Sequence, residues 1–147
     1  MIRIANAVWK GGPGSGEGSV STSSGVISKA LFSFGSGTGN EPCTSPSEML
    51  AAAVASCMAL MVAQETARHG FKEAYIRVES ALSLEEKKGE WHITGIQLNV
   101  TGAPEMSSRP FKHAVETAAT KCPISRALRV PISLTTKTEA PLEEVLA

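Results

Sequence analysis

The sequence predicts a mixed fold of helices and antiparallel strands, and three observations support it. Residues 45–70 carry the start and stop signals of a long apolar helix. Residues 73–101 change to an apolar period of two, the period of β-strands. Residues 1–34 hold three short alternating segments separated by glycine-containing turns. The length of 147 residues suits one domain, or one protomer of a compact oligomer.

Composition and charge exclude several classes of protein. The 14 basic and 14 acidic residues cancel, which argues against a nucleic-acid partner. The first 20 residues lack the apolar core of a signal peptide, and the longest uncharged apolar run is too short to cross a bilayer. We therefore expect a cytoplasmic protein with no membrane partner. The three cysteines are too few for a disulfide scaffold, and with the three histidines they form no metal-binding spacing. No metal and no bound cofactor are expected.

The N-terminal residues 1–34 predict a small antiparallel meander. Its strands are expected at Ile2–Trp9, Ser19–Ser23 and Val26–Phe34, with a turn at Ser24-Gly25. The glycines of Gly11–Gly18 indicate turn geometry, because they precede a strand and not the helix that a phosphate-binding loop requires. A second glycine-rich loop, residues 35–42, leads to the helix.

The helix over residues 45–70 is predicted to lie at the centre of the fold. Ser45 is a suitable N-cap, Pro46 suits the first turn, and Glu48 stands at the capping-box spacing. Gly70 is expected to end the helix in the left-handed conformation. No charged residue occurs from position 49 to 63, and a helix that is apolar all round is usually buried on all sides.

The remaining residues predict a ribbon, a helical region and a strand. Residues 73–101 are expected to form a two-stranded antiparallel ribbon that turns at 86–89. Residues 110–128 read as a second helical region, with Phe111, Ala114, Val115 and Ala118 on one face. Pro123 disfavours helical geometry at Cys122, so one helix should stop there and a short one should start. A final strand is predicted at 131–137, followed by a tail or short helix over 138–147.

The meander and the ribbon offer too little surface to cover the central helix. A second copy of the chain would cover it, so we expect a homodimer.

Two of the cysteines are candidates for chemistry. Cys57 lies in the middle of the apolar helix, where it could equally be core packing, since free cysteine is among the most buried residue types. Cys122 is expected at a helix N-terminus with Lys121 and Arg126 nearby, a setting that favours a thiolate. Together they suit a dithiol mechanism, in which a peroxide oxidises one thiolate to a sulfenic acid and the other thiol condenses with it.

The stretches TSPSEMLAAAVASC (44–57) and CPISRAL (122–128) resemble the OsmC/Ohr family, the osmotically inducible and organic hydroperoxide resistance proteins. Residues 7–9 and 18–26 resemble the OsmC branch. The resemblance implies an α+β fold, an intertwined homodimer whose antiparallel sheets wrap around long central helices, with the active sites at the interface. It also implies a thiol-dependent peroxidase that reduces organic hydroperoxides in oxidative or osmotic stress defence. Cys57 would be the peroxidatic cysteine and Cys122 the resolving one, reset by an external dithiol reductant such as a lipoyl-type dithiol.

The chain departs from the family pattern at the groups that activate the thiol. The family glutamate stands immediately after the proline, where this chain has Ser47, and Glu48 is one position later. The family arginine falls near Gly37, and no arginine occurs between Arg3 and Arg68. A buried cysteine without a cation has a raised pKa. The candidates to support the thiolate are therefore Arg126, Lys10, Lys29 and the displaced Glu48, although Glu48 is also explained as a capping residue.

Other expectations concern the surroundings of Cys57. An apolar pocket favours a bulky organic hydroperoxide over hydrogen peroxide. Met58, Met61 and Phe111 are candidates to line it, with ordinary core packing as the alternative. Cys43 is expected to be a bystander, with an alternative resolving thiol as its other interpretation.

Two further functions stay open. One is a stress-related or binding protein of the same fold with weak or no peroxidase activity, which the missing arginine and glutamate would explain. The other is a thiol transferase or hydrolase that uses Cys57 alone and needs His113 as a base.

Overall fold

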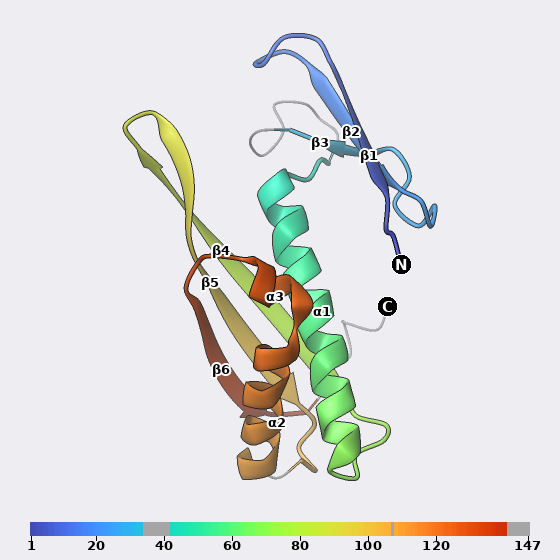
Figure 1. The fold of residues 1–147 in the computed structure, drawn as a ribbon, viewed down its shortest axis with the longest axis vertical. Coiled ribbons are helices and arrows are strands. Elements are labelled where there is room, and N and C mark those ends of the chain that lie inside the picture. Colours follow the sequence, from blue (N-terminus) through green and yellow to red (C-terminus); the bar gives the residue numbers. More distant parts are fainter. Residues whose placement is uncertain (34–41, 107, 141–147) are drawn as a thin grey trace. The chain divides into compact units, whose positions relative to one another are not determined.

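The computed structural model describes residues 1–33, 42–106 and 108–140, in two compact units that span residues 1–50 and 51–147 (Figure 1). Each unit is described by itself. The prediction of a single domain over 1–147 stays a prediction. Several predicted features fall outside the described residues: the end of the third strand at Phe34, the loop through Gly37, and the tail beyond residue 140.

The first unit contains a three-stranded antiparallel sheet, in the order β1-β2-β3. Its strands are β1 Ala5–Lys10, β2 Glu17–Thr22 and β3 Ala30–Phe32. The predicted strand from Val26 is wrong over its first residues. The backbone N–H of Thr22 donates to the carbonyl of Ile27, which closes a wider loop, and Lys29 has a φ of 52° that no strand residue adopts.

The long helix α1, Pro46–Arg68, begins and ends with the predicted caps. Ser45 Oγ accepts a hydrogen bond of 3.2 Å from the backbone N–H of Glu48. At the other end the N–H of Phe71 donates to the carbonyl of Thr66, and Gly70 has a φ of +94°. This pair of features is a Schellman motif, which satisfies carbonyls that the helix would otherwise leave open.

The second unit holds a sheet in the order β4-β5-β6. Strands β4, Ile76–Lys87, and β5, Glu90–Gly102, form the predicted antiparallel ribbon, which starts three residues later than expected. Lys88 and Gly89 make its turn with φ values of 54° and 82°, as a two-residue hairpin of type I′ requires. The final strand β6, Ile132–Thr138, pairs parallel to β5. The parallel pairing follows from the crossover through two helices, which returns the chain in the same direction.

Those crossover helices are α2, Ser108–Lys121, and α3, Pro123–Ala127. Pro110 fits within the first turn of α2, where a missing N–H costs little. Cys122 stands between the helices with an extended ψ of 111°, the conformation that a following proline favours. The break therefore comes at the residue that the sequence indicates.

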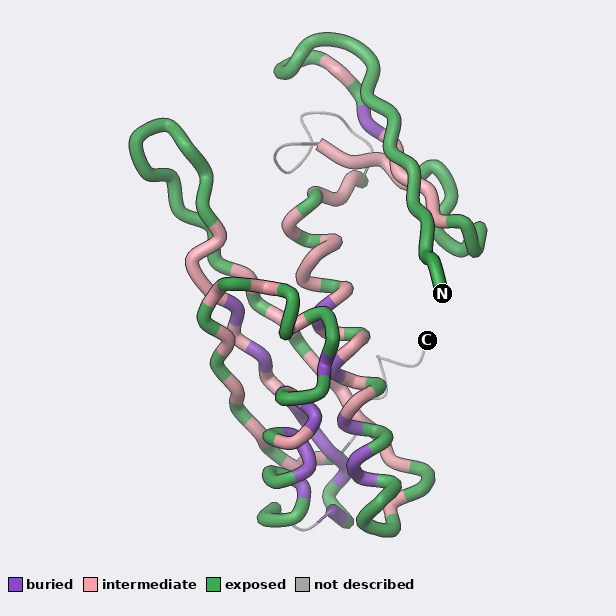
Figure 2. The backbone as a smooth tube through the Cα atoms, in the orientation of Figure 1, coloured by how far each residue is buried: buried purple, intermediate pink, exposed green. Residues whose placement is uncertain are grey.

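The core of the second unit lies where α1, α2 and one face of the sheet meet. Figure 2 shows the buried stretches along β5 and on α1 and α2. The four residues expected on the inner face of α2 are all buried. Phe111, Val115 and Ala118 pack in one cluster with buried residues of the other elements: Val54, Met58, Val62, Ile96, Leu98, Val100, Ala103, Met106 and Cys122.

Much of the apolar surface of α1 is not covered within one chain. Its buried residues are confined to Val54, Met58, Val62, Glu65 and Thr66, and Leu60 is 65% exposed. A single chain thus leaves the helix partly uncovered, as expected from the small surface that the meander and the ribbon offer. By length and hydropathy alone α1 could cross a membrane, a test that core helices of soluble proteins also pass.

Candidate active site

Two cysteines from distant parts of the chain meet in the second unit. Cys57 Sγ, in the middle of α1, lies 2.8 Å from Cys122 Sγ, at the junction of α2 and α3. Both are free thiols, and an S–S bond is about 2.05 Å long. The structure thus brings together the pair that the sequence singled out, at a distance that needs little motion to close.

The sulfur of Cys122 is held by the first turn of α3. Its side chain is fully buried, and Sγ accepts a hydrogen bond of 3.2 Å from Ser125 Oγ and one of 3.5 Å from the Ser125 backbone N–H. Ser125 was not among the predicted site residues. Its spacing of three after Cys122 is the N-cap spacing, and that signal could have found it.

The environments of the two thiols shift their pKa values in opposite directions. Burial raises the pKa of Cys57, and the hydrogen bond with Cys122 raises it further. Burial also acts to raise the pKa of Cys122, but the hydrogen bonds with Cys57 and from Ser125 outweigh it, so this pKa lies below its ordinary value. The two groups interact strongly and therefore titrate as a pair that shares one proton.

An ion cluster around the buried Glu65 lies beside Cys122, and sequence reasoning missed it. Glu65 Oε1 accepts from Lys121 Nζ at 2.6 Å and from Arg68 at 2.9 Å, while the Glu65 side chain is only 8% exposed. The hydrogen bond from Lys121 holds the pKa of this carboxyl below its ordinary value. The cluster joins the end of α2 to α1 directly before the residue that carries the second sulfur.

Of the predicted thiolate-supporting residues, only Arg126 belongs to the second unit, and its side chain is not among the described contacts of either sulfur. Arg126 is exposed, and its contact with Cys122 is a backbone hydrogen bond of 3.1 Å to the carbonyl. Glu48 is exposed and accepts from Thr44 Oγ1 at 2.7 Å, at a helix position half a turn out of register with Cys57. Lys10 and Lys29 belong to the first unit, and their role stays a prediction.

Other residues expected near Cys57 lie elsewhere. Met58 and Phe111 are buried in the core with Met61 packed against it, which agrees with the alternative of ordinary core packing. A pocket lined by these residues at a dimer interface stays a prediction. Met58 continues the buried stripe of α1 four residues after Val54, which explains its place. The ring of His113 faces His69 across 6.4 Å, on the exposed side of α2.

Cys43, the third cysteine, belongs to the first unit. Its sulfur lies 3.4 Å from Ser33 Oγ. Its expected role as a bystander stays a prediction.

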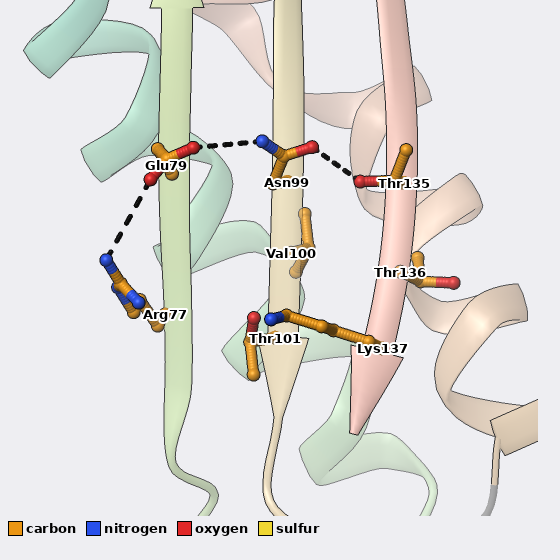
Figure 3. Close-up of a pocket in the computed structure, with 8 residues that line it drawn as sticks. All are labelled: Arg77, Glu79, Asn99, Val100, Thr101, Thr135, Thr136 and Lys137. Atoms are coloured by element: carbon orange, nitrogen blue, oxygen red, sulfur yellow. Dashed lines mark hydrogen bonds and ion pairs between the residues drawn. The ribbon is translucent and has the colours of Figure 1, made fainter. Parts of the chain in front are cut away.

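Two hollows flank the sheet of the second unit. One of about 450 Å³ lies on the helix side and has a mainly apolar lining that includes Leu98 and Leu134, with Ser125 and Arg126 at its polar part. The other, of about 310 Å³, lies on the opposite face, where Arg77, Glu79, Asn99 and Thr135 form a chain of hydrogen bonds and ion pairs (Figure 3). The first hollow includes a residue that touches the thiol pair. Among the described residues, no group of three or more potential metal ligands was found.

Comparison with known proteins places this site in a family. The sequence model described as OsmC-like protein matches residues 37–137, a span that includes both cysteines. The chain belongs to the OsmC family. It is 30% identical to the peroxiredoxin OsmC of Escherichia coli K12 over 129 residues, which cover 87% of this chain and 90% of that protein. The resemblance, and with it the predicted class of a peroxidase-type enzyme, is confirmed.

Solved structures confirm the predicted OsmC-type α+β fold. The organic hydroperoxide resistance protein OhrB of Bacillus subtilis has a TM-score of 0.66 at 21% identity, over 92% of this chain and 98% of that one. An OsmC-like protein of unknown function from Vibrio cholerae has a TM-score of 0.73 at 17% identity, over 93% and 99%. At these identities the likeness establishes the fold alone.

Proposed function

We propose that this OsmC-family protein is a thiol-dependent peroxidase that reduces organic hydroperoxides to alcohols, with Cys57 as the peroxidatic cysteine and Cys122 as the resolving one. The observation that supports this most directly is the approach of the two sulfurs to 2.8 Å across 65 positions of sequence. A pair of structural core cysteines has no need of such an approach. A hydrolase or transferase that used Cys57 alone would need a base, and the described contact of the His113 ring is with His69, not with either sulfur.

The proposed reaction has three steps. The Cys57 thiolate attacks the distal oxygen of the hydroperoxide, the O–O bond breaks, and an alkoxide leaves and is protonated to the alcohol. Cys122 Sγ then attacks the sulfur of the Cys57 sulfenic acid, and water leaves as the disulfide forms. An external dithiol, of lipoyl type for example, reduces that disulfide by thiol–disulfide exchange and becomes a disulfide itself.

The substrate class follows from the surroundings of the thiols. Cys57 and Cys122 adjoin an apolar core, and the hollow next to Ser125 is lined mainly by aliphatic side chains. An alkyl or aryl hydroperoxide gains free energy when it leaves water for such surroundings, whereas hydrogen peroxide has no apolar part.

The proposed assembly is a cytoplasmic homodimer. The uncovered apolar residues of α1, with Leu60 as their largest exposed member, would be covered by a second copy of the chain.

The test is a single-turnover reaction of the reduced protein with equal amounts of cumene hydroperoxide or hydrogen peroxide. We expect one equivalent of the cumyl alcohol per protomer and a faster loss of two thiols with the organic peroxide. Slow oxidation at equal rates with both peroxides would contradict the proposal. It would favour the alternative of a binding or stress-related protein with weak peroxidase activity.

A further inference from the structure

We propose that Cys122 is also the proton acceptor and donor of the first step: its thiolate deprotonates Cys57 and then protonates the departing alkoxide, with Ser125 as the positioning residue. The proposal rests on the proposed peroxidase function and adds to it a role that a resolving cysteine does not need. It also accounts for activation of Cys57 by groups of the chain's own second unit.

The first support is the contact between the two sulfur atoms. At 2.8 Å, Cys57 Sγ and Cys122 Sγ are close enough to share one proton, and two thiolates at this distance would repel each other. The geometry of the contact fits donation from Cys122 to Cys57, and the proposed first step transfers a proton across the same contact in the opposite direction. A transfer between the two sulfurs therefore needs no third group.

The second support is the unequal distribution of donors around the pair. Cys122 Sγ accepts from both the hydroxyl and the backbone N–H of Ser125. Hydrogen bonds to the charged form favour that form, so the negative charge of the singly ionised pair rests mainly on Cys122. Burial and the neighbouring Cys122 raise the pKa of Cys57, which leaves the proton there.

The third support is the position of the other charged groups. Lys121 precedes Cys122 but its ammonium bonds Glu65, which Arg68 also bonds. Arg126 on α3 and Glu116 on α2 line the neighbouring hollow. No cationic side chain of the described residues is among the groups that shift the pKa of either thiol. Of the described hydrogen bonds of the two sulfurs, the one between them is the shortest, at 2.8 Å.

Protons and electrons balance in the proposed reaction. The proton of Cys57 moves to Cys122, and the Cys57 thiolate gives its electron pair to the distal peroxide oxygen as the O–O bond breaks. The alkoxide takes the proton from Cys122 and leaves as the alcohol. Cys122 is again a thiolate, so it can attack the Cys57 sulfenic acid at once. That attack forms the S–S bond and releases hydroxide, which solvent protonates.

The decisive variant is Cys122→Ser in a Cys43→Ser background, with sulfenic acid at Cys57 trapped by dimedone and followed by mass spectrometry. Serine can donate a hydrogen bond but cannot accept the thiol proton at neutral pH. We expect Cys57 to be oxidised about 100-fold more slowly than in the parent at neutral pH, and its rate to keep rising with pH. Oxidation of Cys57 at the parent rate, with accumulation of the sulfenic acid, would overturn the proposal and leave Cys122 a resolving thiol only.

The second variant separates the positioning role of Ser125 from a structural one. Ser125→Ala removes the hydroxyl donor and keeps the backbone N–H, so the first thiol pKa should rise and Cys57 oxidation should slow about tenfold at neutral pH. The loss should disappear at high pH, and Ser125→Thr should restore the parent rate. The control is Ser56→Ala, since Ser56 is exposed and its hydroxyl bonds the helix carbonyl of Ala53. A loss in Ser125→Ala that is equal at all pH values would indicate a structural role and contradict the proposal.

These outcomes are distinct from failure of the peroxidase function itself. If the parent protein with Cys57 and Cys122 intact forms neither alcohol nor disulfide, both the proposed function and the proposed proton transfer are wrong. If the parent is active and Cys122→Ser oxidises Cys57 equally fast, only the proton transfer is wrong.

Discussion

Ser45 and Cys122 occupy the same kind of position, the residue directly before a helix begins. In each case the residue three positions later donates its backbone N–H to the side chain, at 3.2 Å for Ser45 and 3.5 Å for Cys122. At Cys122 the hydroxyl of Ser125 adds a second donor. Ordinary helix-capping geometry thus holds a sulfur atom in place beside Cys57 and supplies the donors that favour its thiolate.

Glu65 is expected to make stability depend on pH. Its pKa in the folded protein lies below the ordinary value of 4.5, mainly because of the hydrogen bond from Lys121. A carboxyl with a lowered folded pKa stabilises the fold above its unfolded pKa, and the contribution is lost as pH falls through the folded pKa. Glu65→Gln should therefore lower the free energy of unfolding at neutral pH, and the difference from wild type should shrink below about pH 4.5.

Urea unfolding at neutral and acid pH measures that difference. The control is Glu116→Gln, which removes an exposed carboxylate 3.9 Å from Lys112 and should change the free energy little at either pH. An effect of Glu65→Gln that stays constant into acid would show that the loss comes from packing and not from the carboxylate charge.

Part of the candidate site could be predicted from the chemistry of individual residues. Cys57 and Cys122 are visible because few side chains are nucleophilic, and Pro123 marks the break at Cys122. The pairing of Glu65 with Lys121 joins residues 56 positions apart, and no local pattern reports such a contact. The thiol-activating role of Arg126 was predicted from its place one turn after Cys122, but the described contact between the two residues is made by the backbone. The role of Glu48 stays a prediction.

The elements were predictable where both ends carry a chemical signal. Helix α1 has a capping serine at one end and a left-handed glycine at the other, and the turn of the β4–β5 ribbon has Lys88 and Gly89. The loop before β3 was not predictable, because Val26 and Ile27 suit a strand by residue type while Lys29 adopts a positive φ. The parallel partner of β6 depends on how two helices cross the sheet, which residue periodicity does not encode.

Substitution of Gly70 tests the Schellman motif that ends helix α1. Its φ of +94° is one that a residue with a Cβ rarely adopts, while the space around a Cβ there is open. Gly70→Ala should therefore lower the free energy of unfolding by about 1–2 kcal/mol through backbone strain alone. Chemical denaturation provides the measurement.

The matched control is Gly14→Ala, since Gly14 also has open space around it and has no positive φ. This substitution should be close to neutral. Equal losses at the two positions would contradict the assignment of Gly70 to a Schellman motif.

At the scale of the whole molecule, the main feature is an apolar helix, α1, that a single chain leaves partly uncovered. The sheet and α2 bury the stripe through Val54, Met58 and Val62, while Leu60 is 65% exposed. In the proposed homodimer, a second copy of the chain covers the other side of α1 and removes its apolar side chains from water. Sequence reasoning reached this expectation from the apolar run and from the small surface of the meander and the ribbon. The arrangement of the two copies depends on contacts between chains that local patterns do not specify.

Leu60→Gln tests that assembly. It should shift the mass measured by analytical ultracentrifugation from dimer towards monomer and raise the dimer dissociation constant by about tenfold or more, because it removes buried apolar area from the interface. Lys72→Gln, in the exposed loop after α1, should leave the mass unchanged. A wild-type protein that is monomeric at micromolar concentration, or a Leu60→Gln dimer as tight as wild type, would refute the proposed interface.

The most direct test of the central claim is to react the reduced protein with one equivalent of cumene hydroperoxide and map the linked cysteines by peptide mass spectrometry. The account predicts a disulfide between Cys57 and Cys122, formed rapidly and to the same extent when Cys43 is replaced by serine. A linkage through Cys43, or thiols at Cys57 and Cys122 that survive the peroxide, would contradict it.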